Sequence, residues 1–121
     1  MTDRATPAAK LLNFRDTVQE PIPNDGASGT SGHPLLKAAE GAGAFDIRIV
    51  RVKPGGVSAD HAHAWEQANY ILAGTGTITL GEEVHPVGPD DFVYVPPMLR
   101  HVFHNTGSDD LLLLSTLGPK E

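Results

Sequence analysis

The sequence contains no cysteine. Disulfide bonds, zinc–thiolate sites and thiol nucleophiles are therefore all excluded. The side chains that remain for metal binding and for acid–base chemistry are histidine, aspartate and glutamate. We expect any reactive site in this chain to be built around these residue types.

Clustered positive charge and long hydrophobic runs are also missing. The net charge is −6 and the isoelectric point about 5.4, and lysine and arginine are scattered singly, so no nucleic-acid partner is expected. The longest fully apolar runs have four residues, far below the ~20 that span a membrane. The first four residues, Met1-Thr2-Asp3-Arg4, lack the basic-then-apolar order of a secretory signal. We therefore expect a soluble cytoplasmic protein with no membrane partner.

Turn-forming residues are plentiful, and they separate short apolar segments. The 13 glycines and 10 prolines fall between these segments rather than in one block. The segments are rich in β-branched and aromatic residues, which is typical of strands in an all-β sandwich or barrel. The expected strands cover residues 45–52, 69–73, 75–80, 92–95, 100–105 and 111–116.

The chain is long enough for one domain, which we divide into three parts. Residues 45–117 are expected to form the barrel and 118–121 a short tail. Residues 1–44 are expected to form an N-terminal arm that wraps the barrel, wraps a partner subunit or is mobile. Within this arm, 8–18 is a short amphipathic stretch, 21–32 is a loop by composition, and 35–39 is one helical turn or an edge strand.

Two of the six histidines, His61 and His63, are separated by a single alanine. Alternate side chains of a strand point to the same face, so both imidazoles would project into one pocket and could grip a divalent metal. Taken alone, the pair is equally compatible with two exposed or packed histidines. The flanking residues decide between these readings.

Two spaced patterns flank and follow the pair. Gly55, Gln67 and Gly74 complete the pattern G-x5-H-x-H-x3-Q-x6-G, and Pro96, His101 and Asn105 give P-x4-H-x3-N. Together they resemble the two motifs of the cupin superfamily, in the right order and across nearly the whole of 45–117. The resemblance implies a cupin fold, a double-stranded β-helix or jelly-roll barrel. It also implies a metal site formed by His61, His63, Gln67 and His101.

The chain departs from the usual cupin pattern at three positions. The family usually has glutamate where Gln67 stands, and Glu66 is one residue out of register, so Gln67 is the better ligand candidate. The family also usually has glycines where Asp90 and Met98 stand. These glycines serve the backbone, so their replacement bears on the local turns and leaves the ligand His101 in place.

The implied ligand set, three imidazoles and one amide, suits one divalent transition metal such as Fe, Mn, Zn or Ni. With no carboxylate among its ligands, the metal would keep its full double positive charge and act as a strong Lewis acid. This favours an isomerase, lyase or cyclase acting on a small oxygenated molecule. The alternatives are a non-haem iron or manganese dioxygenase or oxidase, and a non-catalytic metal-binding or ligand-binding cupin.

The segment from Glu66 to Gly74, E-Q-x-x-Y-x-x-x-G, resembles small sugar-processing cupins, including those that convert unsaturated uronates to linear keto-sugars. This resemblance implies a possible sugar-acid substrate. It is less specific than the resemblance to cupins as a whole.

Further residues are candidates for the pocket and for catalysis. Strand alternation places Asn69 and Ile71 on the face of Gln67, and Phe103 and Asn105 on the face of His101, so all four are expected to line the substrate pocket. An acid or an anion clamp could come from four further residues, with a structural role as the commoner outcome for each: Tyr70, Tyr94, Arg48 and Arg100. Tyr70 and Arg100 are the catalytic candidates that we retain. We also expect a homodimer that covers the exposed sheet edges and the arm.

Overall fold

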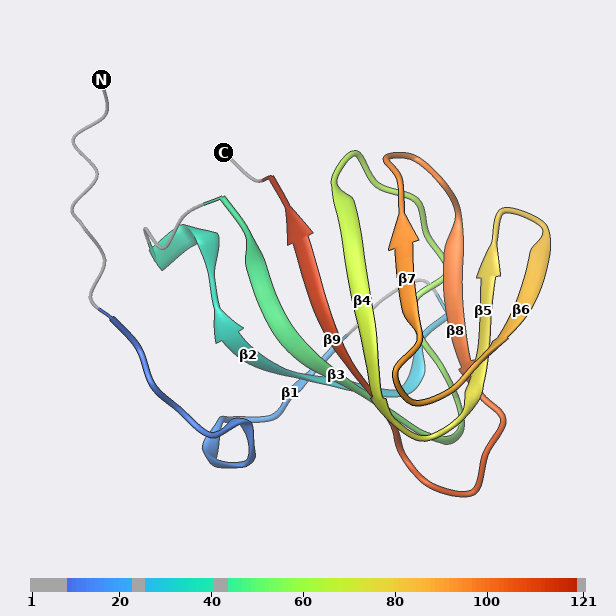
Figure 1. The fold of residues 1–121 in the computed structure, drawn as a ribbon, viewed down its shortest axis with the longest axis horizontal. Helices are drawn as coiled ribbons and strands as arrows, with labels where there is room; N and C mark the ends of the chain where they lie inside the picture. Colours follow the sequence, from blue (N-terminus) through green and yellow to red (C-terminus); the bar gives the residue numbers. More distant parts are fainter. Residues whose placement is uncertain (1–8, 23–25, 41–43, 120–121) are drawn as a thin grey trace.

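The computed structural model describes residues 9–22, 26–40 and 44–119, and it is built almost entirely of β-strands (Figure 1). No α-helix occurs in these residues, and none of their helical turns is long and apolar enough to cross a membrane. Two 3-10 turns, η1 (Phe14–Asp16) and η2 (Ala38–Glu40), accompany nine strands: β1 (Glu20–Pro21), β2 (Ser28–Leu36), β3 (Asp46–Val57), β4 (Glu66–Ala73), β5 (Gly76–Leu80), β6 (Glu83–Val87), β7 (Phe92–Val95), β8 (His101–Asn105) and β9 (Leu111–Gly118).

The strands form one antiparallel sheet that curls into a barrel open on one side, as Figure 1 shows. Its order is β6-β5-β8-β3-β9-β4-β7, and β2 and then β1 are added beside β3. The long strand β3 joins the two halves, because its first part pairs with β9 and its end, Val57, pairs with His104 of β8. This confirms the predicted all-β cupin barrel.

Side-chain alternation decides which residues fill the barrel. In β4 from Gln67 to Leu72 and in β9 from Leu111 to Leu117, every second residue is buried and the intervening residues are partly or fully exposed. Burying aliphatic side chains on one face of each strand gives the sheet a single core. The core residues are Val50, Val52, Ile71, Ile78, Val87, Val93, Val95, Phe103, Leu111 and Leu113.

The N-terminal segment differs from its prediction. Residues 28–32 were expected to be a loop, but they belong to β2, which pairs antiparallel with β3 from Ser28 to Leu36. The prediction was wrong because residues 28–32 are glycine and small polar residues, and their backbone pairing with β3 leaves no hydrophobic pattern in the sequence. In the stretch 35–39, β2 ends at Leu36 and the turn η2 begins at Ala38.

Two further elements were missed or reduced. The edge strand β6 was not predicted, because it is exposed and carries Glu83, His85 and Pro86, residue types that occur on sheet edges but rarely mark a strand. In the stretch 8–18 the helical structure is limited to the three residues of η1, and residue 8 lies outside the described residues.

Candidate metal centre

The three histidines of the predicted site come from two segments of backbone that are paired with each other. His101 is the first residue of β8, and its amide donates to the carbonyl of His61 at 3.0 Å. His61 lies in the connection from β3 to β4, where it forms an isolated bridge with His101. His61 and His63 are therefore not on a regular strand, which corrects the expectation from alternation. The bridge to β8, together with the course of this connection, brings the imidazoles together.

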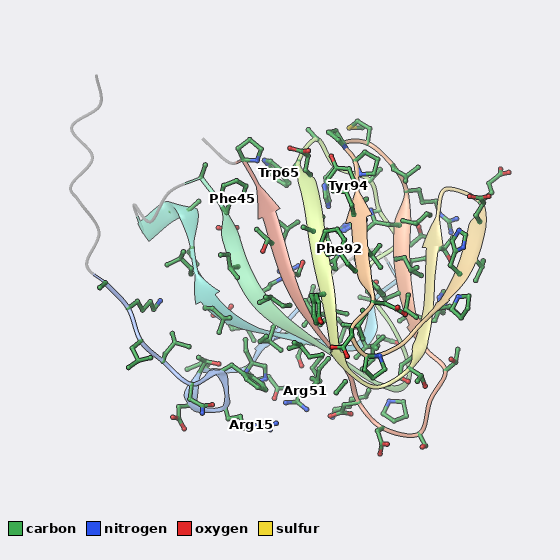
Figure 2. All side chains as sticks on the ribbon, in the orientation of Figure 1. Arg15, Phe45, Arg51, Trp65, Phe92 and Tyr94 are labelled. Carbon is green, nitrogen blue, oxygen red and sulfur yellow. The ribbon has the colours of Figure 1, made fainter. Side chains whose placement is uncertain are left out.

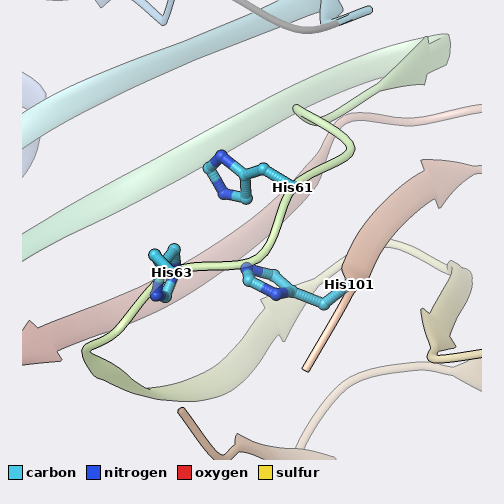
Figure 3. A group of neighbouring side chains, drawn as sticks. All are labelled: His61, His63 and His101. Carbon is cyan, nitrogen blue, oxygen red and sulfur yellow. The ribbon is translucent and has the colours of Figure 1, made fainter. Parts of the chain in front are cut away.

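The three imidazole rings face one another (Figure 3). The distances between ring centroids are 5.1 Å for His61–His63, 5.0 Å for His61–His101 and 4.8 Å for His63–His101. One ring nitrogen from each residue can be chosen so that all three lie within 4.8 Å of one another. Three nitrogens at this spacing can reach one metal ion from three directions.

Hydrogen bonds fix the tautomer of two of these rings. Nδ1 of His101 lies 2.9 Å from the carbonyl of Leu99, and Nδ1 of His63 lies 2.9 Å from the carbonyl of Trp65. A carbonyl only accepts, so each Nδ1 carries the proton and the lone pair of each neutral ring is on Nε2. Nε2 of His101 is buried and has no hydrogen-bond partner. Such an orphaned acceptor is what a metal ligand looks like without its ion.

Burial favours the neutral form of His101. Its side chain is among the least exposed polar groups of the chain, and loss of solvation lowers its pKa. The hydrogen bond to Leu99 acts in the opposite direction, and the neighbouring His63 and His61 lower the pKa further. Only neutral imidazole binds a metal, so this environment favours the ligand form of the ring.

The fourth predicted ligand, Gln67, is oriented by a chain of hydrogen bonds. The Asn69 amide nitrogen donates to the carbonyl of Val93 at 3.3 Å, so the Asn69 side-chain oxygen is left to accept. It accepts from the amide nitrogen of Gln67 at 2.9 Å. The amide oxygen of Gln67 must then point the other way, toward His63. Asn69 thus acts as a positioning residue for the Gln67 oxygen.

The contact between Gln67 and His63 provides a direct test of whether a cation fits. Oε1 of Gln67 lies 3.1 Å from Nε2 of His63. With the proton of His63 on Nδ1, both atoms are acceptors, and a cation shared between them makes the contact favourable. Two ligands about 2.1 Å from one metal and at roughly a right angle are about 3.0 Å apart. The residues present therefore fit a divalent metal.

The four predicted pocket residues occupy different environments. Phe103 lines a small cavity of about 40 Å³ together with His61, Gln67 and His101. Asn69 is fully buried behind Gln67, and Ile71 is part of the hydrophobic core. Asn105 closes a loop at the opposite end of β8. Of the four, only Phe103 is therefore in the wall of the cavity that His61, Gln67 and His101 line.

The two candidate catalytic residues have hydrogen-bond partners outside the cluster of imidazoles. Tyr70 is on the exposed face of β4, and its hydroxyl donates to Asp90 at 2.8 Å. Arg100 forms a two-pronged pair with Asp60, both distances being 2.7 Å, and also donates to the Gly81 carbonyl at 3.0 Å. This hydrogen-bonded pair raises the pKa of Arg100 and lowers that of Asp60. Because Asp60 precedes His61 and Arg100 precedes His101, the pair connects the same two segments as the backbone bridge.

The positions where the family usually has glycine keep a glycine-like backbone. Asp90 has φ 72° and Met98 has φ 67°, both in the left-handed region. The amide of Met98 donates to the carbonyl of His63 at 2.7 Å. The turn that follows β7 therefore supports the segment that carries His63, although it contains no glycine at that point.

A larger cavity of about 360 Å³ opens beside the histidines. His61, His63 and Trp65 line one part of it, and residues of β2 and β3 line another. Sequence reasoning missed the contribution of β2, because residues 28–32 were predicted to be a loop and 35–39 only one helical turn or an edge strand. The charged residues of this wall are Glu20, Lys37, Asp46 and Arg48.

Comparison with known proteins agrees with the fold. The family model for the cupin domain (Cupin_2) matches residues 48–117. Protein SchB of Streptomyces halstedii is 30% identical over 112 residues, covering 92% of this chain and 78% of that protein. Polyketide synthase CurC of Streptomyces cyaneus is 28% identical over 107 residues, covering 85% and 70%.

Among solved structures, the polyketide cyclase RemF from Streptomyces resistomycificus has a TM-score of 0.83 and 25% identity. The match covers 91% of this chain and 79% of RemF. Fold, motif spacing and family match thus lead to one conclusion, that this chain is a member of the cupin family with a barrel of the cupin-2 type.

Proposed function

We propose that this chain is an enzyme that uses one divalent transition metal as a Lewis acid on a small oxygenated molecule, and that the reaction is a cyclisation of a polyketide-like chain. The observation that carries the proposal is the ligand set of three imidazoles and one amide oxygen. It contains no carboxylate, so a bound ion keeps its double positive charge. The names of RemF and CurC support the choice of reaction.

The proposed roles follow from the geometry. His61, His63, His101 and Gln67 hold the metal, which is Fe, Mn, Zn or Ni. A bound divalent ion would supply positive charge that polarises a carbonyl oxygen of the substrate. The cavity of about 360 Å³ is within the range of small-molecule sites. Its apolar wall receives the carbon skeleton and limits access of water, through Ile22, Pro34, Leu36, Ile47 and Leu117.

The experiment that tests this function separates metal chemistry from oxygen chemistry. The zinc-loaded protein is incubated without oxygen with a linear poly-β-carbonyl compound, and cyclic product is measured by mass spectrometry. We expect product from wild type and from the control His104→Ala, because His104 lies on β8 but outside the cluster. We expect none from His101→Ala.

Two other outcomes would replace the proposal. Oxygen uptake by the iron(II)-loaded protein, with no anaerobic product, would establish a dioxygenase or oxidase. Tight metal binding without turnover of any compound in a panel that includes unsaturated uronates would establish a non-catalytic binding protein.

We also propose that the chain forms a homodimer. Strand β7 lies at one end of the sheet order, and two of its aromatic side chains, Phe92 and Tyr94, are 62% and 47% exposed (Figure 2). Exposed aromatic groups on a sheet edge favour association with a second copy. A single-chain mass in light scattering at micromolar concentration would contradict this expectation.

A further inference from the structure

Arg48 points into the barrel although it is charged. It lies on β3 two and four residues before Val50 and Val52, which both belong to the hydrophobic core, so alternation puts the three side chains on the same face. Its cross-strand neighbours are Pro34 on β2 and Ser115 on β9. The guanidinium group is thus directed to the interior, where the two cavities lie.

The guanidinium group of Arg48 is incompletely satisfied. Its Nε atom is buried and has no hydrogen-bond partner. Loss of solvation lowers the pKa of Arg48, and the nearby charge of Asp46 raises it. By contrast, Arg51 contacts Asp110 at 2.6 Å, and Arg100 forms its two-pronged pair with Asp60. A buried donor without a partner is costly unless a ligand provides the acceptor.

Arg48 shares both cavities with the predicted metal ligands. It lines the cavity of about 360 Å³ with His61 and His63, and the cavity of about 40 Å³ with His61, Gln67 and His101. The smaller space is large enough to hold a water-sized group. Arg48 and His61 line both cavities, so an acceptor atom placed between these two residues comes close to a guanidinium group and to an imidazole.

The charges around the cavity favour a negative ligand. The acidic residues in its wall have contacts of their own: Glu20 lies 3.9 Å from Lys37, and the Asp46 carboxylate accepts from the Ala38 amide at 2.8 Å. The four predicted metal ligands carry no negative charge. A bound divalent ion and Arg48 would together leave this part of the cavity strongly positive, which attracts an anion.

We propose that Arg48 is an anion-binding residue of the substrate site, and that the substrate carries an ionised oxygen group, a carboxylate or an ionised enol, next to its reacting carbonyl. This inference rests on the proposed function for the metal-dependent step. The planar fork of an arginine side chain suits such a group, because it can donate two parallel hydrogen bonds to one anion.

Trp65 provides a direct reporter for the test. It is the single tryptophan of the chain, it lines the larger cavity, and it is 40% exposed. Benzoate and benzamide have nearly the same shape but differ in charge. Each is titrated into metal-free and zinc-loaded protein while tryptophan emission is followed. We expect wild type to bind benzoate at least about tenfold more tightly than benzamide in both forms.

Variants assign the preference to Arg48. Arg48→Met should abolish the preference for benzoate in metal-free protein and should not lower the melting temperature, because it removes a buried, incompletely paired charge. Arg48→Lys should retain part of the preference, since it keeps the charge but not the fork. Arg51→Met is the matched control on the same strand and should behave as wild type. Figure 2 shows Trp65 in the upper part of the view and Arg51 in the lower part.

The inference is overturned if wild type binds benzoate and benzamide equally, if benzoate does not bind, or if the preference survives in Arg48→Met. Should Arg48→Met fail to fold, an unchanged preference in Arg48→Lys overturns it as well. The metal-free titration keeps this result separate from the proposed function. A chain that binds no metal but shows the Arg48-dependent preference would refute the proposed function alone.

Discussion

The two ends of strand β8 carry buried polar groups that differ in their hydrogen bonding: those at one end have partners, and those at the other do not. At its last residue, the Asn105 amide nitrogen donates to the carbonyls of Val52 and Asp109, both at 2.8 Å, and its oxygen accepts from the Gly107 amide at 2.8 Å. At its first residue, Nε2 of His101 is buried without a partner, and Nε of Arg48 near the same cavity is also unpartnered.

This difference separates a structural group from a functional one. A buried polar group whose hydrogen bonds are complete stabilises the fold, because other arrangements of the chain would break these bonds. A buried polar group with an open position lowers stability until a ligand fills it. We therefore expect mutations at the Asn105 end to change stability, and mutations at the His101 end to change binding.

The largest expected effect on stability is at the closed end. Asn105→Ala removes three hydrogen bonds and leaves buried backbone groups without partners, so we expect the free energy of unfolding to fall by about 2–4 kcal/mol. Chemical denaturation measures this change. Metal affinity, measured below the unfolding transition, should remain that of wild type. An altered metal affinity with unchanged stability would reverse the roles of the two ends.

Asn69→Ala is the counterpart at the open end. Without the Asn69 oxygen, the Gln67 amide is free to turn, and its oxygen is no longer held toward His63. We expect metal affinity to fall by about 10–100-fold, the usual effect of losing a group that orients a ligand. Competition with a chelating dye measures it, with Asn105→Ala as the control. Wild-type affinity in Asn69→Ala would mean that Gln67 needs no orientation or is not a ligand.

The backbone shows the same contrast on a smaller scale. Near the closed end, the left-handed position is filled by Gly74 with φ 85°, whereas near the histidines it is filled by Met98 with φ 67°. Met98→Gly should stabilise the fold by about 0.5 kcal/mol, because glycine relieves the left-handed cost but loses more entropy on folding. The amide that supports His63 remains, so metal affinity should not change. A loss of stability would show that the exposed Met98 side chain makes a contribution of its own.

The smallest expected effect is on the stability of the fold at acid pH. The hydrogen bond from Arg100 lowers the pKa of Asp60 in the folded state. The pair therefore contributes stability above about pH 4, and this contribution is lost as the pH falls through the lowered pKa. Asp60→Asn should make the loss of stability in acid less steep than in wild type. Melting temperatures between pH 2 and pH 7 test this, and parallel curves for both proteins would speak against it.

The sequence alone predicted the parts of the fold that carry a repeated pattern. Strands β3, β4, β5 and β7–β9 were recognisable because each is a short run rich in branched and aromatic residues. Turns that contain glycine or proline separate these runs. Strand β2 was not recognisable, because Ser28–Leu36 gains its order from pairing with β3 rather than from its own side chains. The short strand β6 could not be recognised either, because most of its residues are exposed and its sequence lacks the pattern of a half-buried strand.

The candidate site shows the same limit. The spacing of the motifs was enough to name His61, His63, Gln67 and His101, although the reason from strand alternation was wrong for the first two. The orientation of Gln67 and the open donor of Arg48 could not be predicted, because both depend on partners that are distant in sequence: Val93 for the first and the wall formed by β2 for the second.

The most direct test of the account is the metal content of the purified protein. Mass spectrometry is applied to wild type, to the double variant His61→Ala, His63→Ala, and to the control His104→Ala, each after incubation with a divalent metal and removal of excess. We predict about one equivalent of transition metal in wild type and in the control, and none in the double variant. A wild type without metal, or a double variant that retains it, would contradict the assignment of the site.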